Sequence, residues 1–381
     1  MPFHIKIFKN VSELYEIRKD WGKLAERADS PSIALTPDWF ISWWNAHSGN
    51  DGWQLQVIAL FEDKILTAVF PFYWSISRYR GLPVRKLSLL VDGISPHGDF
   101  VIEGDRREKA IDLLLSYLSG HQELWNIVVL DKFRDSDNRK CLLQLLSSYN
   151  FKYGIEPSLR TPIIQASEPW DVFWSGHSVK FKKSMRNKLN RVKNNGTISV
   201  ERVHDAEALN RALPTIFEVS RRSWKGKIKE DIKNRDAECR FYKAFTEIGA
   251  RRGWVDIWLL KVQDQAIAYE YHLTYNSSTY PLRADFDESY RHLSPGSILE
   301  YKIIKQMFEK GEYDTYYSCA NDYQYLRNWT NTYEQLLKIE IFSNRLLSKI
   351  AHRIEYTFIP QLRKIRLVRK VKELLMQGKR L

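Results

Sequence analysis

The spacing of hydrophobic residues in the first half of the chain changes repeatedly between the period of a helix and that of a strand. Apolar residues recur at helical spacing over residues 11–27 and 38–47, and β-like runs follow at residues 55–61 and 65–74. An acidic turn at Asp63 joins these two runs, which is typical of an antiparallel hairpin. This alternation of helices and strands predicts a mixed α/β fold.

A comparable order of elements returns in the second half. Three helix-like segments come first, at about residues 170–194, 205–223 and 236–250. A second hairpin follows over residues 255–275, and it matches the first with Asp264 opposite Asp63, a spacing of 201 residues. One matching hairpin fits a duplicated domain and also any antiparallel sheet, so the pattern alone leaves both interpretations open.

The segment from Asp287 to Gly296 leads from a third β-like run into a well-marked helix start. Ser294 is placed as the N-cap, Pro295 takes the first helical position, and Gly311 ends the helix. A helix N-terminus exposes unpaired backbone N–H groups and the positive end of the helix dipole, so it attracts an anion. The alternative is an ordinary helix start that binds nothing.

The charge balance agrees with an anionic partner. The 381 residues include 59 Lys and Arg against 46 Asp and Glu, a net charge of +13, and seven of the basic residues lie between Lys180 and Lys193. Nucleic acid, an acidic membrane surface and a phosphorylated cofactor all fit, and this cluster can equally be a solvated helix face. Only Phe181 lies inside the cluster to stack on a base, so the signal is general attraction of anions.

Several enzyme classes lack their signature motifs. The sequence has no GxGxxG, GxxxxGK[ST] or GxSxG, so it gives no support to dinucleotide, P-loop or hydrolase functions. The nine histidines form neither HExxH nor an HxH pair, and Cys141, Cys239 and Cys319 lie far apart. We therefore expect no metal site, no disulfide framework and a reducing compartment.

The last part of the chain, residues 341–381, differs in character from the rest. It carries eleven basic residues against two acidic ones. Apolar residues between Leu362 and Leu375 alternate with basic ones at helical spacing, which predicts a basic amphipathic helix. Three alternatives stay open: this helix packs on the second domain, contacts an anionic membrane, or is disordered.

The sequence predicts a cytoplasmic protein. Its first residues contain no long apolar segment, and no apolar run approaches the roughly 18 residues of a membrane-spanning helix. Peripheral contact with the inner membrane face, through the basic tail, is the option that the composition leaves.

Several short motifs of the chain occur together in one known family. In the second half they are Phe286-Asp287, Tyr290, Ser294-Pro295-Gly296, Leu299 and Asp314. In the first half they are the helix TPDWFISWW, the strand residues Ala68 to Pro71 and the run HGDFV, and the basic helix KKSMRNKLNRVKNNG opens the second half. With these motifs, residues 1–340 resemble the CelD-like acetyltransferases of cellulose biosynthesis, a branch of the GNAT superfamily related to the FemAB-like transferases.

The resemblance implies two tandem GNAT-like domains, each a mixed, mostly antiparallel sheet flanked by helices. They are expected at residues 1–165 and 166–340, followed by the basic helical tail at 341–381. The resemblance also implies acetyl-CoA or another acyl-CoA as the donor, with no metal. It places the CoA diphosphate at the start of the helix described above, on Leu293, Ser294, Gly296, Ser297, Ile298 and Leu299.

Acyl transfer needs a base for the nucleophile and an acid for the departing thiolate. Strand alternation over residues 266–275 places Glu270 and His272 on one face, where they form the best general-base pair in the chain. On the next strand, Arg283 and Asp285 share a face. Asp285 is a further catalytic candidate, and the alternative is a structural ion pair between this strand and Glu270.

The candidate acid is Tyr325 or Tyr317. Tyr325 belongs to a segment, residues 321–329, in which this chain departs from the family that it resembles. Leu326 stands where lysine is common. If that lysine contacts substrate or cofactor, the acceptor differs here or activity is lost.

Three functions follow as hypotheses. The leading one is an acyl-CoA-dependent N- or O-acyltransferase that acts on a sugar or polysaccharide precursor, an acceptor class taken from the family analogy. The second is FemAB-like transfer of an aminoacyl group from tRNA. The third is a non-catalytic assembly or membrane-surface factor in envelope polysaccharide synthesis.

Overall fold

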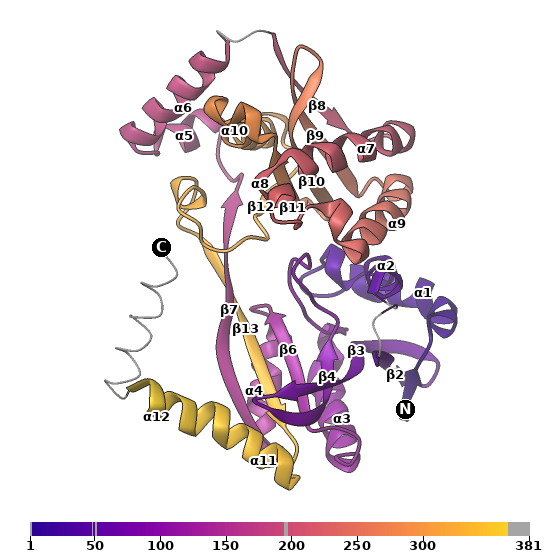
Figure 1. The fold of residues 1–381 in the computed structure, drawn as a ribbon. Coiled ribbons are helices and arrows are strands. Elements are labelled where there is room, and N and C mark those ends of the chain that lie inside the picture. The colour runs from indigo at the N-terminus through magenta and orange to yellow at the C-terminus, as the bar shows by residue number, and fades with distance from the viewer. Residues whose placement is uncertain (1, 48, 50–51, 194–196, 365–381) are drawn as a thin grey trace.

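The computed structural model describes residues 2–47, 49, 52–193 and 197–364, and the elements alternate between helix and strand throughout (Figure 1). The first half consists of β1 (Phe3–Phe8), α1 (Val11–Glu26), α2 (Pro37–His47), β2 (Gln54–Glu62), β3 (Ile65–Tyr79), β4 (Leu82–Leu89), β5 (Val101–Ile102), α3 (Arg107–Gly120), β6 (Ile127–Phe133), α4 (Asp137–Leu146) and β7 (Lys152–Gln165). The second half consists of α5 (Trp170–Ser175), α6 (Val179–Lys193), β8 (Ile198–Val203), α7 (Ala206–Arg222), α8 (Trp224–Lys227), α9 (Asp236–Arg252), β9 (Val255–Val262), β10 (Gln265–Tyr275), β11 (Ser278–Phe286), α10 (Pro295–Lys310) and β12 (Thr315–Tyr317).

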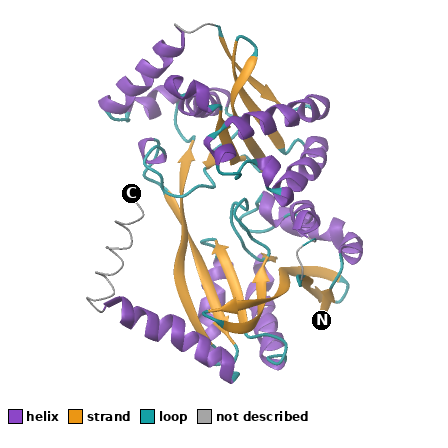
Figure 2. Cartoon of the chain, viewed as in Figure 1, coloured by secondary structure: helices purple, strands orange, loops and turns teal. Residues whose placement is uncertain are grey.

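Each half contains the same series of elements. A strand, two long helices and three antiparallel strands are followed by a helix and a strand that pairs in parallel, β6 with β4 in the first half and β12 with β11 in the second. Helices flank the mostly antiparallel sheet in both halves, as Figure 2 shows. The predicted α/β fold with two tandem GNAT-like units is confirmed.

The two hairpins match at a register one residue away from the predicted one. Thr67 of β3 and Ile267 of β10 are both skipped in the pairing with the preceding strand. The bulges therefore align the halves at a spacing of 200 residues, which makes Phe70 the counterpart of Glu270. Because a slip of one residue moves every side chain of a strand to the other face, this correction decides which residues correspond.

One hydrophobic cluster contains residues of both halves. The aromatic helix predicted at residues 38–47 is α2, and its Trp39 packs on Phe241 and Phe245 of α9 at ring-centroid distances of 4.9 and 5.5 Å. Edge-to-face aromatic contacts of this kind stabilise a buried interface beyond the area that they cover. The two halves are therefore held together by a shared hydrophobic cluster.

A strand from the end of the chain completes the sheet of the first half. β13 (Tyr333–Phe342) lies between β6 and β7 and is antiparallel to both. β7 in turn pairs with β13 along residues 152–162 and with β12 at residues 163–165, so one sheet passes through both halves (Figure 1). The predicted domain boundaries stay a prediction, and β13 extends across the second of them.

The described part of the tail is helical. α11 (Leu346–Arg353), a π-helical turn (Ile354–Phe358) and α12 (Ile359–Lys364) follow one another, and α11 packs on β4, β7 and β13. Most of the amphipathic segment predicted at residues 362–375 lies outside the described residues. Among the helices that the structure describes, none is long and apolar enough to cross a membrane.

Candidate functional site

A cavity of about 520 Å³ opens in the second half where two neighbouring strands separate. β11 and β12 pair in parallel only at Ser278–Thr279 and Thr315–Tyr316, and they diverge beyond that point. The cavity lies between the diverging strands, with β10 and the first turn of α10 on its walls and residues 318–326 at its margin. Segments that are far apart in the sequence thus meet around one hollow.

The start of α10 faces this cavity. Ser294 is the N-cap, as predicted, but its backbone is left-handed (φ 56°) and its side chain makes no capping hydrogen bond. The first N–H groups of a helix have no intrahelical acceptor, and here they belong to Gly296 and Ser297, because Pro295 has no N–H. Both residues line the cavity. Lys188 of α6 adds positive charge nearby by donating to Ser297 Oγ at 2.9 Å.

The remaining predicted diphosphate residues do not line the cavity. Leu293, Ile298 and Leu299 are buried in the hydrophobic cluster of the second half. They fix the position of the helix start rather than touch a ligand. Gly296 itself sits in ordinary space, since an added Cβ would meet only Phe286 Cδ1 at 3.6 Å. A larger side chain at this position would project into the cavity.

Glu270 is the buried acid of the site, and His272 supports it. His272 Nε2 lies 2.8 Å from Glu270 Oε2, and its Nδ1 lies 2.8 Å from Thr279 Oγ1. Burial raises the pKa of Glu270 to about 8 and lowers the pKa of His272 to about 3. Only Glu270 of this pair lines the cavity. The two predicted residues therefore lie together, with His272 behind the carboxyl group that faces the cavity.

A second buried carboxyl group, Glu300, shares the cavity with Glu270. Trp329 Nε1 donates to Glu300 Oε2 at 2.9 Å. Burial, and next the charge of Glu270, raise the pKa of Glu300 to about 8. Glu300 is not among the site residues that were predicted from the sequence. The signal was present, because Glu300 falls on the apolar face of a helix between Leu299 and Ile303, where an acid requires a reason.

Asp285 lines the same cavity but is fully engaged. Its carboxylate accepts hydrogen bonds from Ser220 Oγ, Tyr269 Oη and Arg283 Nε, each at 2.9 Å, and forms an ion pair with Lys225. Arg283 also bonds to Glu238, and not to Glu270, so the alternative of an ion pair with Glu270 was wrong. A carboxylate with four donors is a poor base, and we regard Asp285 as an anchor for the wall of the cavity.

The two candidate acids lie in different places. Tyr325 lines the cavity and is half exposed, and it stacks on Tyr323 at 5.9 Å. Burial raises its pKa, and Glu300 and Glu270 add to the effect, so it stays protonated. Tyr317 is buried in the cluster between the halves and does not line the cavity. Leu326, where the family that this chain resembles often has lysine, lies at the margin of the cavity.

Residues 179–327 match the family model described as the acetyltransferase (GNAT) domain. The second half of the chain, in which these residues lie, is named the GNAT domain after this match. This domain contains α10, both buried carboxyl groups and the whole wall of the cavity. The resemblance to the CelD-like branch stays a prediction. The comparison with curated proteins gave no match.

Solved structures similar to the whole chain show the same fold at low identity. FemX is 12% identical, with 92% of this chain and 100% of FemX covered and a TM-score of 0.59. The C-terminal domain of a putative lysylphosphatidylglycerol synthetase from Agrobacterium fabrum is 9% identical, with 88% and 95% covered and a TM-score of 0.53. L-PGS from Bacillus licheniformis is 11% identical, with 87% and 94% covered and a TM-score of 0.51.

At the corresponding place in the first half, described residues of the chain occupy the space between the separating strands. Residues 90–106, which link β4 to α3, are hydrogen bonded into the gap between β4 and β6. Gly98 N–H donates to Lys132 O at 2.9 Å, and Lys132 Nζ donates to Ser95 O at 2.8 Å. A Cβ on Gly98 would lie 2.5 Å from the Leu89 side chain and 3.0 Å from Asp131 O. The gap is filled by the chain itself.

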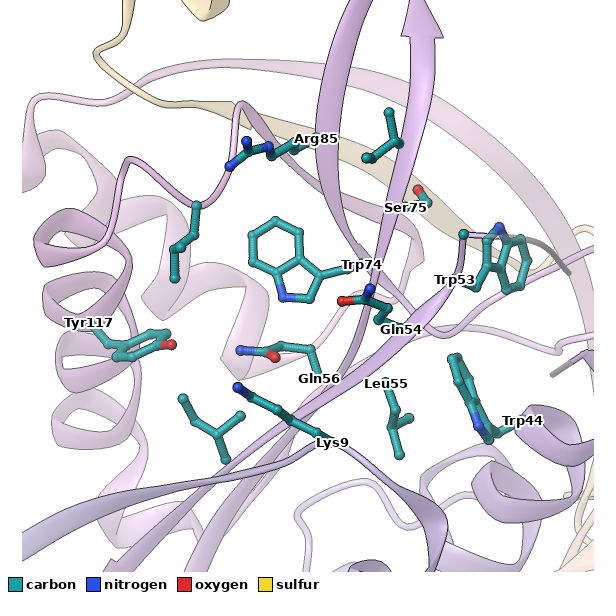
Figure 3. A pocket seen from close by; sticks show the side chains of 14 residues that line it. Lys9, Trp44, Trp53, Gln54, Leu55, Gln56, Trp74, Ser75, Arg85 and Tyr117 are labelled. Carbon is teal, nitrogen blue, oxygen red and sulfur yellow. The ribbon is translucent and has the colours of Figure 1, made fainter.

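The first half carries a separate, larger groove of about 720 Å³ (Figure 3). Trp74 lies in its middle, between Tyr117 on one side and Gln54 on the other, and Arg85 and Lys9 lie at its ends. None of the predicted site residues lines it, and no carboxylate is among its described lining residues.

Proposed function

We propose that the GNAT domain transfers an acyl group from an acyl-CoA to an amine or hydroxyl group of an acceptor that enters the cavity. One observation carries this proposal: an anion-attracting helix start and a buried carboxyl group face the same hollow. Gly296 and Ser297 supply the first, and Glu270 supplies the second. The helix start can bind the diphosphate of an acyl-CoA, and the carboxyl group can accept the proton of the attacking nucleophile.

The residues at the start of α10 suit a diphosphate. The N–H groups of Gly296 and Ser297, the dipole of a helix anchored in the core and the ammonium group of Lys188 all favour negative charge there. A CoA thioester bound at this end would bring its acyl group toward the interior of the cavity. The domain supplies the acetyl-CoA or other acyl-CoA site from backbone groups, with a lysine as support.

Glu270 is the proposed base. Its carboxylate accepts the proton of the acceptor's N–H or O–H as the new C–N or C–O bond forms, and the C–S bond of the thioester breaks. Tyr325, protonated at the margin of the cavity, gives a proton to the departing sulfur. His272 is a positioning residue, because it holds the Glu270 carboxyl group without lining the cavity itself.

A second donor class has an observation in its favour. α6 carries seven basic residues, and two of them reach the start of α10: Lys188 bonds to Ser297, and Arg191 donates to His292 O at 2.6 Å. A basic helix beside the donor end of the cavity suits a larger polyanion, such as the tRNA of the FemAB-like alternative. For the acceptor, the resemblance to the CelD-like proteins makes sugar or polysaccharide precursors the first class to screen.

The test is a titration of the full chain with CoA and acetyl-CoA, followed by calorimetry and by the shift in melting temperature. A ligand that binds only the folded state raises the melting temperature. The variant Gly296→Phe should weaken binding about tenfold or more without loss of folding. The matched control is Gly120→Phe, at an exposed glycine with open space around it.

Two results would contradict the proposal. If Gly296→Phe bound CoA with unchanged affinity, the donor would not bind at the start of α10. Absence of any CoA binding, together with salt-sensitive binding of charged tRNA, would make the aminoacyl donor the correct one.

A further inference from the structure

The last described helix presents a row of apolar side chains to solvent. From Leu346 to Lys364, α11, the π-helical turn and α12 follow one another directly, and every fourth residue of one row is apolar. These residues are Leu346, Ile350, Ile354, Phe358 and Leu362. Ile354 is half-buried, and the other four are 75%, 40%, 56% and 52% exposed. Single exposed apolar residues are ordinary, but a continuous row of them forms a surface that calls for a partner.

The opposite, buried face of the helix determines the orientation of the apolar row. Ser348, Ala351 and Glu355 are buried against the first half. Arg80 Nη2 donates to Glu355 Oε1 at 2.6 Å, and Tyr356 donates to Glu340 at 2.9 Å. The apolar row therefore faces outward, and Figure 1 shows the helix along the outer edge of the first half.

Basic side chains run beside the apolar row. Arg345, Lys349 and Arg353 each come one residue before a member of the row, and all three are exposed. Glu355 is the one acid in residues 345–364, and it is buried and paired with Arg80. An apolar row flanked by unopposed positive charge is the composition of a helix that lies in the plane of an anionic lipid surface.

We propose that this helix, residues 346–364, binds the protein to the surface of an anionic membrane. The apolar row enters the boundary between headgroups and acyl chains, and the basic row contacts lipid phosphates. A second copy of the chain would bring the same positive charge to this face, which disfavours a dimer there.

The experiment is co-sedimentation of the full chain with vesicles of phosphatidylcholine alone and with about a third of phosphatidylglycerol. We expect binding to the second vesicle only, weakened when the salt concentration is raised. The double variant Leu346→Ser/Phe358→Ser should bind about tenfold more weakly or worse. The matched control is Ile65→Ser/Ile76→Ser, which removes two apolar side chains that are 62% and 76% exposed elsewhere on the first half.

Each other outcome overturns the proposal. Absence of binding to anionic vesicles at low salt removes the membrane as partner. Equal loss of binding in the test and control variants shows nonspecific hydrophobic binding rather than a defined site. Full binding in the test variant shows that another surface contacts the membrane. If size-exclusion chromatography shows a dimer that only the test variant abolishes, the partner of the apolar row is a second copy.

Discussion

The two halves of the chain share one series of elements and differ where their parallel strands separate. In the GNAT domain, that gap is a cavity with Glu270 on its wall. In the first half, the counterpart of Glu270 is Phe70, and its ring packs on Phe100 at 5.0 Å, within the segment that fills the gap. Two similar scaffolds thus differ in the residues at one gap, which is open in the GNAT domain and occupied by the chain in the first half.

The largest expected effect would break this comparison at the cavity. Glu270→Gln keeps the shape of the side chain and removes the base, so kcat/KM for acyl transfer should fall by roughly 10²–10⁴-fold. CoA affinity should stay the same, because the donor site lies on α10. Steady-state kinetics and calorimetry measure the two quantities, and Glu247→Gln, at an exposed acid, is the control.

If Glu270→Gln retained full activity, the base would be another residue. Glu300 is the next to test, since it faces the same cavity. If substitutions at Glu270 and Glu300 both left the activity unchanged, neither carboxyl group of this cavity would be the base.

A second test compares the two gaps through their glycines. Gly98→Ala forces a Cβ within 3.0 Å of backbone and side-chain atoms, so it should lower the free energy of unfolding by about 1–3 kcal/mol. Gly296→Ala meets an ordinary contact and should change it by less than about 0.5 kcal/mol. Urea unfolding of both variants measures the difference. Equal losses of free energy of unfolding in the two variants would mean that residues 90–106 do not fill the gap between β4 and β6.

A third test measures the electrostatics of the cavity. Since the pKa of Glu300 in the folded protein is raised to about 8, the folded state binds more protons than the unfolded state between about pH 4.5 and 8. The free energy of unfolding contributed by this group is therefore highest at low pH and falls as the pH rises, by up to about 1.4 kcal/mol per pH unit. Glu300→Gln should flatten that slope, which urea unfolding at pH 5, 6.5 and 8 measures; an unchanged slope would show that Glu300 titrates normally.

Local signals in the sequence were enough to predict part of the site. The alternation over residues 266–275 placed Glu270 and His272 together, and the Ser294-Pro295-Gly296 segment located the start of α10. Ser294 shows the limit of a local rule. Serine is a common N-cap residue, but here its backbone is left-handed and its side chain makes no capping hydrogen bond. The position of a helix start can be predicted, then, without the bonds that complete it.

Features that depend on pairing between distant segments were out of reach. The bulges at Thr67 and Ile267 shift the repeat by one residue, and a bulge depends on the partner strand rather than on its own sequence. The meeting of Glu300 with Glu270 depends on how α10 packs over β10. The return of β13 to the first sheet joins residues 333–342 to strands that lie some 200 residues earlier, and no periodicity records such a pairing.

The position of β13 sets a condition on how the protein is made. During synthesis, β6 and β7 emerge from the ribosome long before the strand that separates them, so the first sheet has an open seam while the whole GNAT domain is being translated. An unpaired strand edge of this kind invites wrong partners. The sheet of the first half can therefore be completed only after β13 has been synthesised. Folding of the first half thus depends on the end of the chain, although the architecture consists of two similar units.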